Sequence, residues 1–120
     1  MKKTFFVIFL TTLLLACEHS NYDVIDFTGD YRYHAGITEF FDCKSQIKYY
    51  VADAGIASQL QDMYQGLNFK RKEDVFIKVR GYLKEEIQMD GVAPIDVFVP
   101  VELLSHDTNR GCDRPIRQGY

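Results

Sequence analysis

The chain has 120 residues, and its 14 Lys and Arg against 17 Asp and Glu give a formal net charge of −3 at pH 7. This acidic balance, without any basic stripe, argues against nucleic acid as a partner, because nucleic-acid binding depends on clustered Lys and Arg. The length allows one small domain and excludes a second.

The amino terminus has the features of a targeting segment. Lys2 and Lys3 form a basic start, residues 4–16 form an apolar run, and Cys17 follows directly. A membrane-spanning helix needs about 20 apolar residues, so the run is too short to cross a bilayer. We therefore interpret residues 1–16 as a signal peptide that is not part of the folded domain.

Cys17 ends a short motif, Leu-Leu-Ala-Cys, that resembles the lipobox of bacterial lipoproteins. The resemblance implies that Cys17 is diacylated, that the preceding segment is removed, and that the new amino terminus is acylated. Three acyl chains exceed the two signals that stable anchoring requires. The alternative is an ordinary signal peptide with a chance cysteine. In lipoproteins of enteric bacteria, Asp directly after the lipidated cysteine favours retention in the inner membrane. Glu18 occupies this position here, which indicates the outer membrane of a bacterial envelope.

The two remaining cysteines, Cys43 and Cys112, form an even pair in an exported, oxidising setting, which predicts a disulfide. Closing a loop of about 70 residues would stabilise the fold by roughly 4 kcal/mol. The alternatives are a catalytic cysteine or a metal site with His34 or His106. The chain lacks the close, repeated Cys and His spacing of a metal site, so we expect no catalytic residue, metal or cofactor.

The chain after Cys17 divides into a polar tether, residues 17–28, and a domain, residues 29–120. Alternating polar and apolar residues predict a strand over 30–35. The aromatic, strand-like runs over 38–43 and 47–52 predict two more strands, joined as a hairpin by a turn at 44–46.

A helix follows the third predicted strand, with Asp53 as its N-cap and Gly66 near its end. Its apolar face has helical spacing and consists of Ile56, Leu60, Met63, Tyr64 and Leu67. Two further strands are predicted over 75–83 and 93–104, joined by a long polar hairpin arm over 84–91. Gly81 and Pro100 indicate bulges or an edge position within these strands.

Three strands, one helix and two strands predict a mainly β fold. The order matches an OB-fold-like five-stranded antiparallel barrel with the helix between the third and fourth strands. The alternative, a β-sandwich, would require about seven strands.

The sequence from Gly29 to Cys112 resembles the C-terminal OB-like domain of the NlpE family of outer-membrane lipoproteins. The most specific matches are Gly29, Tyr31 and Tyr33, Phe41-Asp42-Cys43, Tyr50-Val51-Ala52, and Ile77, Val79 and Gly81. The family is linked to copper homeostasis, surface sensing and envelope-stress signalling. The resemblance implies that oxidation of Cys43 and Cys112 reports on periplasmic redox folding, and that a two-component sensor kinase is the partner. The family's additional N-terminal domain with a Cys-x-x-Cys motif has no match here, so copper binding through it is not implied.

Three functions fit these features. The first is a membrane-anchored, non-catalytic envelope module that contacts a protein partner such as a sensor kinase. The second is a small-ligand or glycan binder, because Tyr and Phe together number 17 and OB-folds bind chains across one exposed sheet face. That face would contain Tyr31, Tyr33, Tyr50 and Tyr82, although barrel core is an alternative place for them. The third is an inhibitor of a cell-wall-degrading enzyme.

Overall fold

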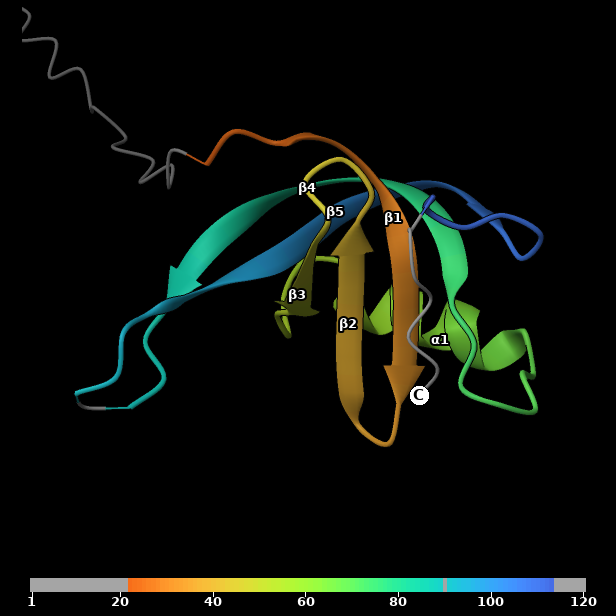
Figure 1. Ribbon diagram of the computed structural model, residues 1–120, viewed down its shortest axis with the longest axis horizontal. Helices are drawn as coiled ribbons and strands as arrows, with labels where there is room; N and C mark the ends of the chain where they lie inside the picture. The colour runs from red at the N-terminus through yellow and green to blue at the C-terminus, as the bar shows by residue number, and fades with distance from the viewer. Residues whose placement is uncertain (1–21, 90, 114–120) are drawn as a thin grey trace, which may run out of the picture.

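The computed structural model describes residues 22–89 and 91–113 and shows a closed five-stranded barrel with one helix (Figure 1). The elements in chain order are β1 (Ile25–His34), β2 (Ile37–Asp42), β3 (Ile47–Val51), α1 (Ala57–Gly66), β4 (Val75–Glu86) and β5 (Ile95–Asp107). The predicted OB-like barrel, with its helix between β3 and β4, is confirmed. In the part of the chain described, no helix is long and apolar enough to cross a membrane.

The strands surround the barrel in the order β1-β2-β3-β5-β4. Neighbours run antiparallel, except that β3 and β5 pair in parallel at Tyr50 with Val97 and at Val51 with Phe98. A closed ring of five strands cannot alternate direction throughout, so one parallel contact is required. The predicted hairpin of β2 and β3 is confirmed by their antiparallel register.

The barrel begins earlier than the sequence indicated. Residues 25–28, which the sequence assigned to the tether, belong to β1 and pair with β4 from Ile25 opposite Gly81. Only one of these four residues points into the core, Phe27, whose ring meets Phe98 edge-on at 4.9 Å. A single inward residue is too short a pattern to indicate a strand.

The helix also begins later than predicted. The prediction that Asp53 caps it is wrong, because the N-cap is Ile56 and no side chain caps the helix. The preceding residues follow β5 instead, and the Ile56 N–H donates to the Pro100 carbonyl at 2.9 Å. Gly55 allows this path with a φ of +58°, and a Cβ there would overlap the Pro100 oxygen. The helix ends at Gly66, close to the predicted position.

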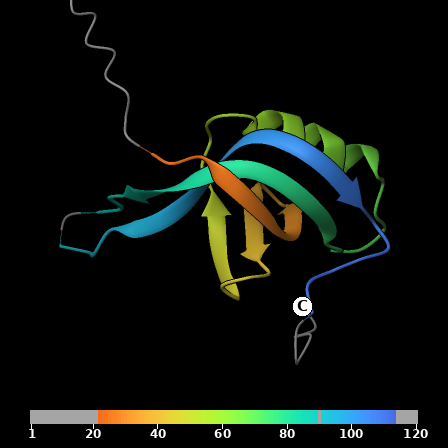
Figure 2. The same ribbon diagram turned by 90° about the horizontal axis from the view of Figure 1, so that it is seen from above.

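The hairpin of β4 and β5 extends beyond the barrel as an arm (Figures 1 and 2). Pairing of β1 with β4 stops at Gly81, whereas β4 continues to pair with β5 as far as Glu86 opposite Ile95. Both strands are longer than predicted. Their register shifts between Arg80 and Gly81, and Gly81 lies opposite Pro100, so the predicted irregularity at these residues is present.

Aromatic side chains form the core. Phe40 and Phe98 stack with ring centroids 4.6 Å apart, and Tyr31 is fully buried beside them in the same cluster. α1 contributes Leu60 and Tyr64 to this cluster. Among the buried side chains that the structure describes, the Tyr31 hydroxyl has no hydrogen-bond partner. The Tyr64 hydroxyl, in contrast, donates to the Glu73 carbonyl at 2.5 Å.

We expect Tyr31→Phe to leave the free energy of unfolding unchanged or to raise it, because burial of an unpaired hydroxyl costs about 1–3 kcal/mol. The matched control is Tyr64→Phe, which should lower the free energy of unfolding by about 1 kcal/mol because it removes a hydrogen bond. Urea unfolding of the two variants measures both effects. A larger loss for Tyr31→Phe than for Tyr64→Phe would contradict this assignment.

Tyr31→Phe should also change how the free energy of unfolding depends on alkaline pH. Burial, followed by the proximity of Tyr33 and Tyr64, raises the pKa of Tyr31 above its ordinary value of 10.0. The difference in pKa between the folded and unfolded states therefore stabilises the fold fully below pH 10. This stabilisation decreases at higher pH, where the Tyr31 phenol ionises in the unfolded chain before it does so in the folded one. The free energy of unfolding should fall more steeply above pH 10 in the wild type than in Tyr31→Phe.

Candidate functional site

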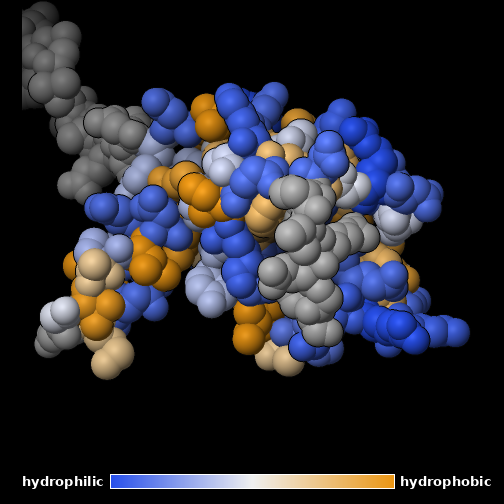
Figure 3. All heavy atoms as spheres, viewed as in Figure 1, coloured by the Kyte–Doolittle hydropathy of each residue, from blue (hydrophilic) through white to orange (hydrophobic). Residues whose placement is uncertain are grey.

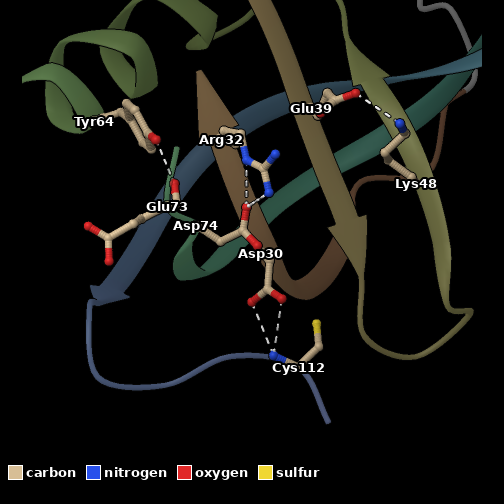
Figure 4. Close-up of polar contacts among 8 residues, drawn as sticks. All are labelled: Asp30, Arg32, Glu39, Lys48, Tyr64, Glu73, Asp74 and Cys112. Carbon is tan, nitrogen blue, oxygen red and sulfur yellow. Dashed lines mark hydrogen bonds and ion pairs between the residues drawn. The ribbon is translucent and has the colours of Figure 1, made fainter. Parts of the chain in front are cut away.

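The chain after β5 folds back across the outside of the barrel and is bonded to it there. Cys112 forms a disulfide with Cys43, which directly follows β2, with 5.1 Å between the Cα atoms. The predicted disulfide is therefore confirmed. The Cys112 N–H also donates to both carboxylate oxygens of Asp30, at 3.1 and 3.3 Å (Figure 4). We call residues 108–113 the C-terminal strap.

Asp30 lies on β1 between Phe41 of β2 and Phe76 of β4. It is 2% exposed, which is rare for a carboxylate, and it accepts hydrogen bonds from the strap backbone. Arg110 of the strap lies over the ring of Phe76, 4.6 Å from its centroid. The strap thus covers this part of the sheet through a covalent bond, a charged hydrogen bond and a cation–π contact.

Two residues further along β1, a second polar group is buried. The Arg32 guanidinium donates to one carboxylate oxygen of Asp74 from Nε at 2.9 Å and from Nη2 at 2.7 Å. The two side chains are only 7% and 14% exposed. The neighbouring Glu73 accepts the hydrogen bond of Tyr64 (Figure 4). The segment before β4 therefore covers Arg32 as the strap covers Asp30.

The outer surface of β2 and β3 carries a more exposed polar pair. Lys48 contacts Glu39 across the hairpin at 2.9 Å, and its ammonium lies 5.9 Å from the centre of the Tyr50 ring. Half of the Lys48 side chain is open to solvent, so the pair adds little stability. A shallow groove of about 510 Å³ lies between this hairpin and the start of α1, bordered by Ile37, Tyr50 and Gln61.

The predicted tyrosine ligand face is wrong, because the four side chains do not share a surface. Tyr31 is in the core, and Tyr33 packs against it. Tyr50 is on the outside of β3 and is 51% exposed. Tyr82 stacks on Tyr22 at the base of the arm, with ring centroids 4.7 Å apart. A strand prediction does not by itself say which side of the strand faces inward.

The structure limits the chemistry of the cysteines. In the disulfide form, neither Cys43 nor Cys112 is a free thiol. Within residues 22–89 and 91–113, no three His, Cys, Asp or Glu side chains are grouped so that they could hold a metal ion. Cys17, the predicted lipidation site, lies outside the described residues.

Asp30, Arg32 and Asp74 were not identified as functional residues from the sequence. Asp30 and Arg32 occupy the polar positions of an alternating strand, which is the ordinary pattern of a solvent-facing side. Their burial depends on segments 82 and 42 residues away in the chain. No local sequence signal distinguishes them from solvated residues.

Comparisons with known proteins agree with this architecture. The family described as the NlpE C-terminal OB domain matches residues 21–113. Among solved structures, the crystal structure of the Cpx pathway activator NlpE from Escherichia coli matches with a TM-score of 0.61 and 23% sequence identity. The match covers 93% of this chain and 54% of that protein, so this chain spans about half its length. None of the curated protein sequences compared with the chain is a significant match.

We expect removal of the disulfide to lower the free energy of unfolding by roughly 4 kcal/mol, because reduction frees a loop of about 70 residues in the unfolded chain. The measurement is urea unfolding of the protein from residue 17 onward, with Cys17→Ser, compared with the same protein carrying Cys43→Ala and Cys112→Ala. A reductant should destabilise the first protein and leave the second unchanged. Equal stability of the two proteins would contradict a structural role for the bond.

Proposed function

The chain belongs to the NlpE C-terminal OB domain family, and we propose that it acts as a non-catalytic, lipid-anchored module of the bacterial cell envelope that signals stress to a protein partner. The solved relative is described as an activator of the Cpx pathway, which supports a signalling role. The observation that carries the proposal is the Cys43–Cys112 bond, which holds the strap over the buried carboxylate of Asp30.

The signal in this proposal is the oxidation state of that bond. A dithiol reductant would convert the Sγ–Sγ bond into two thiols and would itself become a disulfide. The strap would then keep non-covalent contacts, the hydrogen bond to Asp30 and the contact of Arg110 with Phe76 among them. Release of the strap would remove the hydrogen bond from the Cys112 N–H to Asp30 and would expose this carboxylate to water. Hydration of Asp30 favours the released state, because a buried carboxylate is costly when it loses a donor. Reduction therefore favours exposure of the outer surface of β1 to a partner such as a sensor kinase.

The anchor in this proposal is Cys17. Residues 1–16 would be removed as a signal peptide, Cys17 would carry the acyl chains, and the barrel would begin at Ile25. Glu18 after the lipidated cysteine supports the outer membrane as the location. This arrangement keeps the module at a membrane surface of the cell envelope.

The proposal is tested in bacteria that carry this protein and a transcriptional reporter of envelope stress. The variant with Cys43→Ala and Cys112→Ala should change reporter output without any treatment, because its strap is never bonded. Addition of a reductant should change the output of the wild type and leave that of the variant unaltered. Protein abundance is measured in parallel.

The matched control is Leu60→Ala, which destabilises the core from α1 and leaves the residues of the strap unchanged. Leu60 is fully buried, so the truncation should cost about 2–5 kcal/mol, comparable to loss of the disulfide. Equal reporter output from both variants would mean that the cell responds to misfolding and not to the bond. Unchanged output from the cysteine variant would reject the signalling role.

A further inference from the structure

The tip of the β4–β5 arm exposes apolar side chains that the barrel does not use. Ile87 is 79% exposed, Met89 is 69% exposed and Val92 is 53% exposed. The first two are the most exposed large apolar side chains among the described residues. Figure 3 shows apolar residues on the arm, at the lower left, among hydrophilic neighbours. A cluster of exposed apolar residues at a protruding tip indicates a contact with another apolar surface.

The arm is a paired hairpin as far as Glu86 and Ile95. Its stem is a regular ladder that pairs Lys84 with Val97, Glu85 with Asp96, and Glu86 with Ile95. At the tip, the Val92 N–H donates to the Met89 carbonyl at 3.2 Å and closes a turn. The apolar side chains are therefore presented on a supported hairpin that reaches beyond the barrel.

The position of the first described residue, Tyr22, indicates which surface the tip meets. Tyr22 stacks on Tyr82 at the base of the arm, and in both views the described chain begins on the side to which the arm projects (Figures 1 and 2). From Cys17 to Tyr22 the chain spans at most about 18 Å when fully extended. From Tyr82 to Met89 the arm spans about 23 Å at the rise of a strand. A bilayer that holds an acylated Cys17 is therefore within reach of the tip.

We propose that Ile87, Met89 and Val92 insert into the headgroup layer of the bilayer that anchors Cys17, so that the arm is a second membrane contact. This inference rests on the lipid anchor of the proposed function. Anchoring raises the effective concentration of the tip at the membrane to the millimolar range, so a weak affinity of the hairpin is sufficient. The backbone of the turn requires hydration, which limits the contact to the interfacial layer.

The charge of the stem defines the lipid class. Glu85 lies directly opposite Asp96, and Glu86 follows, while Lys84 is the one cation among the described residues of the stem. The sequence places one further acidic residue, Asp90, between Met89 and Gly91. These carboxylates would be repelled by an anionic surface. The arm therefore fits a zwitterionic membrane surface better than an anionic one.

Two membrane contacts, the acylated Cys17 and the tip of the arm, would fix the orientation of the barrel on the bilayer. One flexible anchor could not do so. The last described residues, which contain the strap, lie away from the arm in both views (Figures 1 and 2). With the tip in the membrane, the strap and Asp30 face away from the bilayer. The surface that the disulfide covers is thereby presented to a partner outside the lipid.

The sequence contains no tryptophan, so Met89→Trp introduces one fluorophore at the tip. In the oxidised protein from residue 17 onward, Cys17 is the one cysteine outside the disulfide, so a maleimide lipid attaches the protein to vesicles through it. The control is Ile37→Trp, at a 54% exposed residue that begins β2 after the turn from β1 and is not part of the arm.

On phosphatidylcholine vesicles, the indole emission of Met89→Trp should shift to shorter wavelength and should be quenched by brominated acyl chains, while that of Ile37→Trp should show neither change. Replacing part of the lipid by phosphatidylglycerol should reduce the quenching of Met89→Trp. If Met89→Trp emits on vesicles as it does when unattached, the proposal is overturned and the tip is assigned to a protein contact. Equal quenching of Ile37→Trp would also overturn it, because the barrel would then lie unoriented on the lipid.

Chemical attachment separates this inference from the proposed function. The vesicle experiment needs neither lipidation by the cell nor a signalling partner. Quenching of Met89→Trp with an unresponsive stress reporter would support the arm as a membrane contact and reject the signalling role. The reverse result would retain the signalling role and reject the membrane contact.

Discussion

The link between Cys112, Cys43 and Asp30 decides which surface this barrel presents. A carboxylate that is almost fully buried on the outside of a strand requires donors, and the strap supplies one from its backbone. The disulfide holds that donor in place. Because Arg32 is covered in the same way by Asp74, the outer side of β1 is closed at Asp30 and Arg32, although OB-folds commonly use exposed sheet faces for ligands.

The described part of the molecule consequently has two structurally distinct ends. At one end, the disulfide-bonded strap covers Asp30. At the other end, the β4–β5 arm carries apolar side chains beside the point where the described chain begins. The proposed function assigns redox sensing to the first end, and the proposed membrane contact assigns orientation at the bilayer to the second.

Several features were predictable because they depend on neighbouring residues. Two aromatic runs around a short polar turn identified the β2–β3 hairpin, helical spacing identified α1, and Gly81 with Pro100 indicated irregular pairing in β4 and β5. The even number of cysteines after Cys17 identified the disulfide. The tyrosines show the limit of this reasoning, because Tyr31 lies in the core and Tyr50 in solvent, and the residue type is the same at both positions.

The sequence by itself determined the order of the strands and the helix, the family resemblance and the pairing of Cys43 with Cys112. Periodicity and cysteine count are local or compositional properties, so they can be determined without knowledge of the packing. Only the tertiary structure decided that Asp30 and Arg32 are buried and that Ile87 and Met89 are exposed. Burial depends on which distant segments cover a residue, and for Asp30 that segment lies 82 residues further along the chain.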